Sequence, residues 1–161
     1  MSYFVMYDKS TWNRYLCDIY VGRVRVECII DTASSNTLVP LKFAEDYGKK
    51  LNHSAKVIVA GNTYEATLYL FENTLFGNLK IEKLVAFAAN YKGNIENRML
   101  LGLNVINNLE ITFSRHKDKL YFNYKPYHLV KNKKYPCAMF FKTQGSEPVY
   151  PTELLVDIAT F

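Results

Sequence analysis

The sequence lacks the features that mark secreted and membrane-spanning proteins. No uninterrupted apolar run approaches the roughly 18 residues that suggest a membrane-spanning helix. The amino terminus has no basic region, apolar core and small-residue cleavage site in the order that a secretory signal peptide requires. We therefore expect a soluble, cytoplasmic protein that does not contact a membrane.

Cysteine and histidine are few, and their spacing does not suit a metal site. The three cysteines, Cys17, Cys28 and Cys137, include no Cys-x-x-Cys pair, and the three histidines do not combine with them into a ligand motif. The sequence therefore predicts no metal and no cofactor.

Charge of one sign is not concentrated anywhere in the chain. The formal charge of +5 is spread along the sequence, and the densest basic stretch, residues 131–134, is only four residues long. A nucleic-acid-binding groove needs more basic residues on one surface, with aromatic side chains among them. We expect no nucleic-acid partner.

What the sequence does contain is enough for one folded domain. Apolar residues make up 49% of the chain, which is enough to form one hydrophobic core. With 161 residues the chain is too short for two ordinary domains. Strand-like patterns dominate, with short helices expected only after Pro40 and after Gly102. We predict an all-β fold, with residues 1–130 as one lobe and residues 131–161 as a terminal strand or the start of a second lobe.

Residues 15–30 alternate like a β-hairpin with its tip at Gly22 and Arg23. In that register Cys17 faces Cys28 on an apolar face, and we expect two packed thiols in a reducing compartment rather than a disulfide. Asp18 would lie opposite Glu27, and this like-charge pair counts against the register.

Two further turns divide the middle of the chain. Gly61 and Asn62 separate AKVIVA from TYEATLYLF, and Gly77 and Asn78 separate that segment from LKIEKLVAFAA. We predict three consecutive strands, then a polar loop at residues 90–97 and two strands flanking the turn RHKD.

Asp31 is the candidate for catalysis. It follows the apolar residues CII and precedes the small residues TASS. A carboxylate at the end of a buried strand lies in low-dielectric surroundings, which can tune its protonation for acid–base work. The alternative is that Asp31 only caps the turn by accepting a hydrogen bond from the backbone that follows.

The segment IIDTASS resembles the signature of the aspartic proteases, specifically their single-lobe, retropepsin-like branch. That signature is two or three apolar residues followed by Asp-Thr/Ser-Gly-Ala/Ser. MLLGLNVINNLEITF is similar to the family's second apolar run, which ends in glycine beside the catalytic turn, and AKVIVAGNTYEATLYLF stands where the family has its flap hairpin. The resemblance covers roughly residues 15 to 123 and implies a closed barrel.

The resemblance implies hydrolysis of peptide bonds by two carboxylates that share one proton. Asp31 would be catalytic, and Thr32 would brace the two catalytic turns against each other. Because the chain has one clear motif, the second carboxylate would come from a second copy in a homodimer, acting on a peptide or protein substrate. The substrate-binding residues would be Ala33, Ser34, Gly61, Asn62 and Tyr64.

Three alternatives stay open. Ala33 stands where the family has glycine, which leaves room for a non-catalytic dimerisation or peptide-binding module. The segment LVDIAT weakly echoes IIDTAS, so Asp157 would open a second lobe if the chain is the first lobe of a longer two-lobed protease. A third possibility is an unrelated small β-barrel in which DTAS is only a turn.

Overall fold

The computed structural model shows a chain built mainly of β-strands, as the sequence predicts. Its strands join into one sheet and are accompanied by two short helices. The structure describes residues 3–9, 15–77, 79–106, 109–114, 116–117, 119–124, 139–140 and 155–158.

The first predicted hairpin has the predicted register. Strands β2 (Tyr15–Val21) and β3 (Val24–Ile30) are antiparallel, and Cys17 pairs with Cys28. Both cysteines are buried free thiols. Gly22 has φ 59°, a backbone conformation that glycine adopts without steric cost at a tight turn.

The like-charge pair across this hairpin is offset by an arginine. Asp18 does lie opposite Glu27, as the register requires. Arg25 on the same face places its Nε 2.8 Å from Asp18 and a terminal nitrogen 4.0 Å from Glu27. The guanidinium therefore reduces the repulsion that counts against the register in the sequence.

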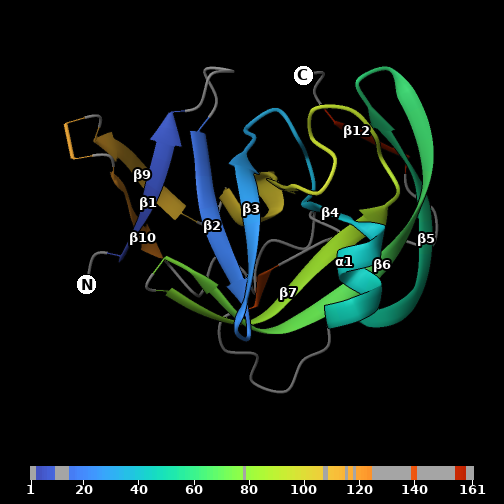
Figure 1. Cartoon of the computed structure of the whole chain (residues 1–161), viewed down its shortest axis with the longest axis horizontal. Helices are drawn as coiled ribbons and strands as arrows, with labels where there is room; N and C mark the ends of the chain where they lie inside the picture. The colour runs from blue at the N-terminus through green and yellow to red at the C-terminus, as the bar shows by residue number, and fades with distance from the viewer. Residues whose placement is uncertain are drawn as a thin grey trace.

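Three long antiparallel strands from the middle of the chain lie next to one another in the sheet (Figure 1). They are β5 (Lys49–Val59), β6 (Asn62–Phe76) and β7 (Leu79–Ala89). The far end of β6 also pairs with β2, so β6 joins the two hairpin systems. β6 ends at Phe76 and β7 begins at Leu79, so the break between the two strands falls where the sequence predicts a turn.

Two short strands lie between β7 and β3 in the sheet, and each is followed by a short helix. Strand β4 (Leu38–Pro40) is followed by helix α1 (Leu41–Tyr47), and strand β8 (Met99–Leu101) is followed by helix α2 (Leu103–Ile106). β8 runs parallel to β3 and also pairs with β4. Both helices occur where the sequence predicts them.

The remaining strands come from the two ends of the chain. β1 (Tyr3–Lys9), for which the sequence analysis predicted no strand, pairs with β2 and β10 (Lys119–Tyr124), and β10 pairs with β9 (Leu109–Ser114). Two short strands follow. β11 (Met139–Phe140) pairs with β7, and β12 (Leu155–Ile158) runs parallel to β5.

β3 separates two hydrophobic clusters because successive side chains of a strand point to opposite faces. Val26, Cys28 and Ile30 pack in one cluster. Ile29 packs in the other, with residues of β5, β6, β7 and β8.

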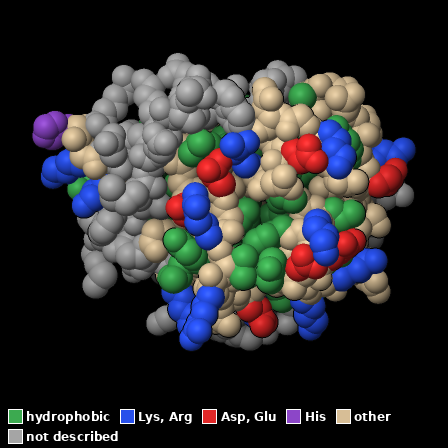
Figure 2. Space-filling model, viewed as in Figure 1, with side chains coloured by type: hydrophobic (Ala, Val, Ile, Leu, Met, Phe, Trp, Pro, Cys, Tyr) green, Lys and Arg blue, Asp and Glu red, His purple; other side chains and the backbone are tan. Residues whose placement is uncertain are grey.

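On the face of the molecule in Figure 2, a group of hydrophobic side chains near the centre is surrounded by interspersed charges of both signs.

Candidate active site

The loop after β3, residues 31–37, is held from one side by residues 101–104, which are the last residue of β8 and the segment that follows it. Asp31 N donates to the carbonyl of Leu101 at 3.0 Å. Farther along, Leu103 N donates to Ser34 O at 2.7 Å, and Asn104 N donates to Ser35 O at 3.2 Å. The run ending in Gly102 therefore lies beside the loop, as the resemblance implies.

Gly102 lies at the point of closest approach. A Cβ atom there would come within 2.3 Å of Asn36 O, 2.4 Å of Asn36 C and 2.9 Å of Ser34 O. All three are backbone atoms of the loop, so no side-chain movement would relieve the overlap. Only glycine allows the two segments to pack at this distance.

Asp31 is nearly enclosed, with 8% of the residue's surface exposed. Ala33 N donates to Asp31 Oδ1 at 3.1 Å, which is the local capping contact of the alternative interpretation. A capped carboxylate is also a positioned one, because the hydrogen bond orients Oδ1. Thr32 and Ala33, in contrast, are exposed.

Ala33 occupies its position without backbone strain. Among the described residues, the non-glycine positions with positive φ are Ala60, Asn73 and Asn97. Ala33 is not one of them, so the loop does not need glycine here for its backbone conformation. The departure from the family pattern thus adds a methyl group on the exposed side of the loop.

Ser34 is completely buried, and its hydroxyl donates to Asn36 O at 2.6 Å. This contact is internal to the loop. Thr37 is also completely buried; its Oγ1 donates to Asn104 Oδ1 at 2.8 Å and accepts from Gly102 N at 3.2 Å. Sequence reasoning missed Thr37 and Asn104; the available signal was a polar residue just before an apolar strand and another just after Gly102.

The hairpin between β5 and β6 turns one residue earlier than predicted. Val59 pairs with Asn62, so the turn residues are Ala60 and Gly61, with φ 50° and 81°. Asn62 is instead the first residue of β6. Two adjacent positive φ values are the geometry of a two-residue hairpin turn, and the sequence GN did not show that alanine would adopt one of them.

The outer part of this hairpin extends beyond β7. The last pair between β6 and β7 joins Thr67 to Ala88, so residues 62–66 of β6 pair with β5 alone among the described strands. Gly61 and Asn62 are exposed at the end of the hairpin. Tyr64 is half-buried and packs against the cluster that contains Ile29, the residue two positions before Asp31.

The alternative second carboxylate, Asp157, lies in a strand that pairs with β5. Asp157 belongs to β12 and is paired with Ile58 of β5, but its side chain lies outside the described part of the chain.

Among the residues that the structure describes, no group of three His, Cys, Asp or Glu side chains is arranged to hold a metal ion. No helix within them is long and apolar enough to span a membrane.

Comparison with known proteins agrees with this geometry. The family model described as aspartyl protease matches residues 17–105, which is more than half of the chain and includes both Asp31 and Gly102. No curated protein sequence matches. Among solved structures, the retropepsin-like aspartic protease from Rickettsia conorii aligns with a TM-score of 0.50 and 13% identity, over 75% of this chain and 98% of that one. The chain therefore belongs to the aspartyl protease family and has the retropepsin-like fold.

Proposed function

We propose that this chain is an aspartic endopeptidase in which Asp31 residues from two copies form the catalytic pair. The observation that carries the proposal is the position of Asp31. It ends a buried strand, its carboxylate is held by Ala33 N, and the loop that carries it is bonded to residues 101–104. Such restraint is what a catalytic group needs to stay in a productive geometry.

The chemistry needs two carboxylates with different protonation. The ionised carboxylate takes a proton from a water molecule, whose oxygen attacks the peptide carbonyl carbon, while the protonated carboxyl group donates a hydrogen bond to the carbonyl oxygen. The leaving amine then takes a proton as the carbon–nitrogen bond breaks. Two like charges a few ångströms apart resist joint ionisation, so the pair shares one proton.

A second copy would supply the partner carboxylate. Thr32 and Ala33 are exposed in the single chain, while Ser34, Asn36 and Thr37 are buried within it. The exposed side of the loop is thus available to the same loop of another copy across a two-fold axis. Thr32 would brace the opposite turn in that arrangement.

An extended peptide would lie between this loop and the β5–β6 hairpin, which would act as a flap. The hairpin's outer part is not held by β7, and Gly61, Asn62 and Tyr64 lie in it. Backbone hydrogen bonds from the hairpin would bind a substrate strand independently of its sequence, together with contacts from Ala33 on the loop side. Ser34, which the sequence also suggested for substrate binding, is completely buried and donates to Asn36 O, so it would support the loop from within.

The residues after 130 form a terminal segment of the same lobe in this proposal. β11 and β12 pair with β7 and β5, which favours a terminal strand over the start of a second lobe. The two-lobed alternative with Asp157, and a module that binds peptide without cleaving it, remain the competing proposals. A cytoplasmic location is part of the proposal and rests on the sequence alone.

Substitution of Asp31 by asparagine tests the proposal. Asp31→Asn keeps the shape of the side chain and removes the charge that activates water, so peptide hydrolysis should fall by about a thousandfold or more with the fold intact. Asp18→Asn, on the neighbouring strand, is the matched control and should retain activity. Full turnover by purified Asp31→Asn would exclude Asp31 from the mechanism.

Sedimentation of the same samples tests the homodimer. Activity should rise with the square of the protein concentration below the dimer dissociation constant, because two chains form each site. A chain that is monomeric at every concentration at which it is active would exclude the shared site.

A further inference from the structure

The three-residue ladder between β3 and β8 has an ion pair at one end. At its other end lies the loop of residues 31–37, called the catalytic loop below because it carries Asp31. Its pairs join residues 28 to 99, 29 to 100 and 30 to 101. The next position before the ladder places Glu27 beside Arg98, and these side chains form an ion pair. The next position after it places Asp31 beside Gly102.

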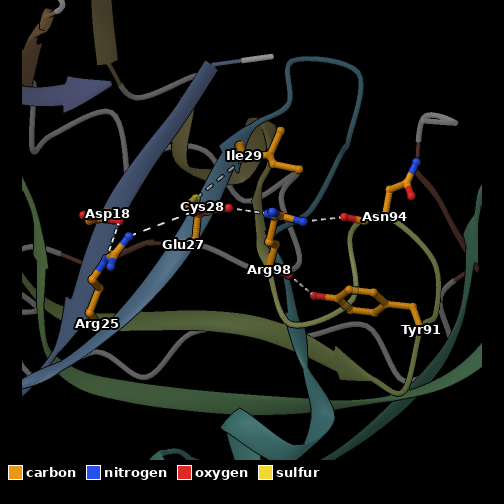
Figure 3. Close-up of polar contacts among 8 residues, drawn as sticks. All are labelled: Asp18, Arg25, Glu27, Cys28, Ile29, Tyr91, Asn94 and Arg98. Atoms are coloured by element: carbon orange, nitrogen blue, oxygen red, sulfur yellow. Dashed lines mark hydrogen bonds and ion pairs between the residues drawn. The ribbon is translucent and has the colours of Figure 1, made fainter. Parts of the chain in front are cut away.

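Arg98 is the centre of the contacts that lead into β8 (Figure 3). Its Nε donates to Glu27 Oε1, and its Nη1 donates to Asn94 O at 2.5 Å. Its backbone N–H donates to Ile95 O at 3.0 Å, and its carbonyl accepts from the Tyr91 hydroxyl. One residue thus connects β3 to the loop of residues 91–98.

This connection matters because β8 is short. It pairs with β3 at three positions and with β4 at one. The residues immediately after it make the hydrogen bonds that hold the catalytic loop. A shift of β8 along β3 would therefore move the acceptor of Asp31 N and the backbone that packs against Ser34 and Asn36.

Side-chain packing on the two faces of β8 also restrains its position along β3. Ile29 and Leu100 pack in one hydrophobic cluster, whereas Cys28, Met99 and Leu101 pack in the other. A slip by one residue would exchange these side chains between the clusters. Packing thus excludes a full slip, and the ion pair restrains the smaller displacements that packing tolerates.

We propose that Arg98, through its ion pair with Glu27, is a positioning residue that holds β8 in register and so fixes Asp31 in its catalytic position. The role in turnover rests on the proposed protease function. The pair borders an open surface depression of about 510 Å³ and its side chains are 28% and 32% exposed, so it adds little to overall stability. Its effect on catalysis and its effect on unfolding should therefore separate.

Substitution of Arg98 by methionine tests the inference on activity. Arg98→Met keeps the aliphatic stem and should lower kcat roughly tenfold with KM changed less than about twofold, because the displacement affects the reacting group more than peptide binding. Glu27→Gln, a milder change, should lower kcat in the same direction. The charge swap Glu27→Arg with Arg98→Glu should restore kcat to within about threefold of the original chain.

Arg25→Met is the matched control. Arg25 lies on the same face, where its main partner is Asp18 at 2.8 Å and Glu27 is 4.0 Å away, so its loss leaves the ion pair of Arg98 with Glu27 in place. It should leave kcat within about twofold. Equal losses in Arg25→Met and Arg98→Met would overturn the inference, because any ion pair on this face would then serve.

Amide exchange provides a readout that does not depend on turnover. In Arg98→Met and Glu27→Gln, but not in Arg25→Met, the amides of Asp31 and Leu103 should exchange at least about tenfold faster. Unchanged exchange and kcat in folded Arg98→Met would overturn the positioning role and leave the protease proposal standing. If the original chain proves inactive, the exchange result alone decides whether the ion pair positions the loop.

Discussion

The two segments that frame the candidate site are stabilised in opposite ways. The loop of residues 31–37 is held by hydrogen bonds to residues about 70 positions away in the chain. The turn of residues 60–61 is closed by its own hairpin pair, Val59 with Asn62, and is exposed. The loop should thus be rigid and intolerant of change, while the turn should respond only to local backbone preferences.

The difference between the loop and the turn is clearest when the glycine that each depends on is replaced. Gly102→Ala should lower the free energy of unfolding the most. The added Cβ would overlap three backbone atoms of Asn36 and Ser34. Relief requires the loop and β8 to separate, so we expect a loss of about 3 kcal/mol or more in the free energy of unfolding. Urea denaturation measures it, and a loss below about 1 kcal/mol would contradict the close approach.

Thr37→Val should have the next largest effect. Valine keeps the shape but removes the acceptor for Gly102 N and the donor to Asn104 Oδ1 inside a completely buried site. We expect a loss of about 2 kcal/mol. Thr63→Val, at the exposed end of the hairpin, is the matched control and should change stability by less than about 0.5 kcal/mol. Similar losses at both positions would remove the contrast.

The same contrast between local and long-range contacts explains which features of the structure the sequence could predict. The β2–β3 register, the break between β6 and β7 and both helices follow from neighbouring residues, and all were predicted. The bonds of Thr37 to Asn104 and of Arg98 to Glu27 join residues 67 and 71 positions apart, and no local pattern indicates them. The motif located the candidate site, whereas its supports required the fold.

Alkaline pH should weaken the packing around Cys28, which lies in β3 ahead of the loop of residues 31–37. Burial raises the pKa of the Cys28 thiol well above its ordinary value of 9.0. The unfolded chain therefore releases this proton first, so the stabilisation is complete below about pH 9 and is lost as pH rises through the folded pKa. The expected slope is up to about 1.4 kcal/mol per pH unit for one proton.

Cys28→Ala tests this slope. Removing the thiol should lower stability at every pH because it leaves a cavity, but it should make stability less dependent on pH between 8 and 10. Urea denaturation under reducing conditions measures both. An unchanged slope would show that another group is responsible; the buried Tyr91 phenol, whose pKa burial also raises, becomes relevant only above its ordinary value of 10.0.

Gly61→Ala should have a smaller effect than Gly102→Ala, and for a different reason. No atom lies within 4 Å of the position of a Cβ at Gly61, so there is no overlap. Its φ of 81° is nevertheless unfavourable for alanine, and we expect a loss of about 1 kcal/mol. Equal losses in Gly61→Ala and Gly102→Ala, measured by urea denaturation, would contradict the distinction between local strain and packing.

Ala60→Asn should have the smallest effect and the opposite sign. Ala60 has φ 50°, which alanine adopts at a cost and asparagine tolerates, and Asn-Gly is the preferred pair for a two-residue hairpin turn with positive φ at both positions. We expect a gain of about 0.5 kcal/mol, together with slower amide exchange at residues 60–63. The variant also distinguishes the observed turn from the one that the sequence suggested. If residues 61 and 62 formed the turn, Ala60 would end a strand, where asparagine is disfavoured, and Ala60→Asn would lower stability.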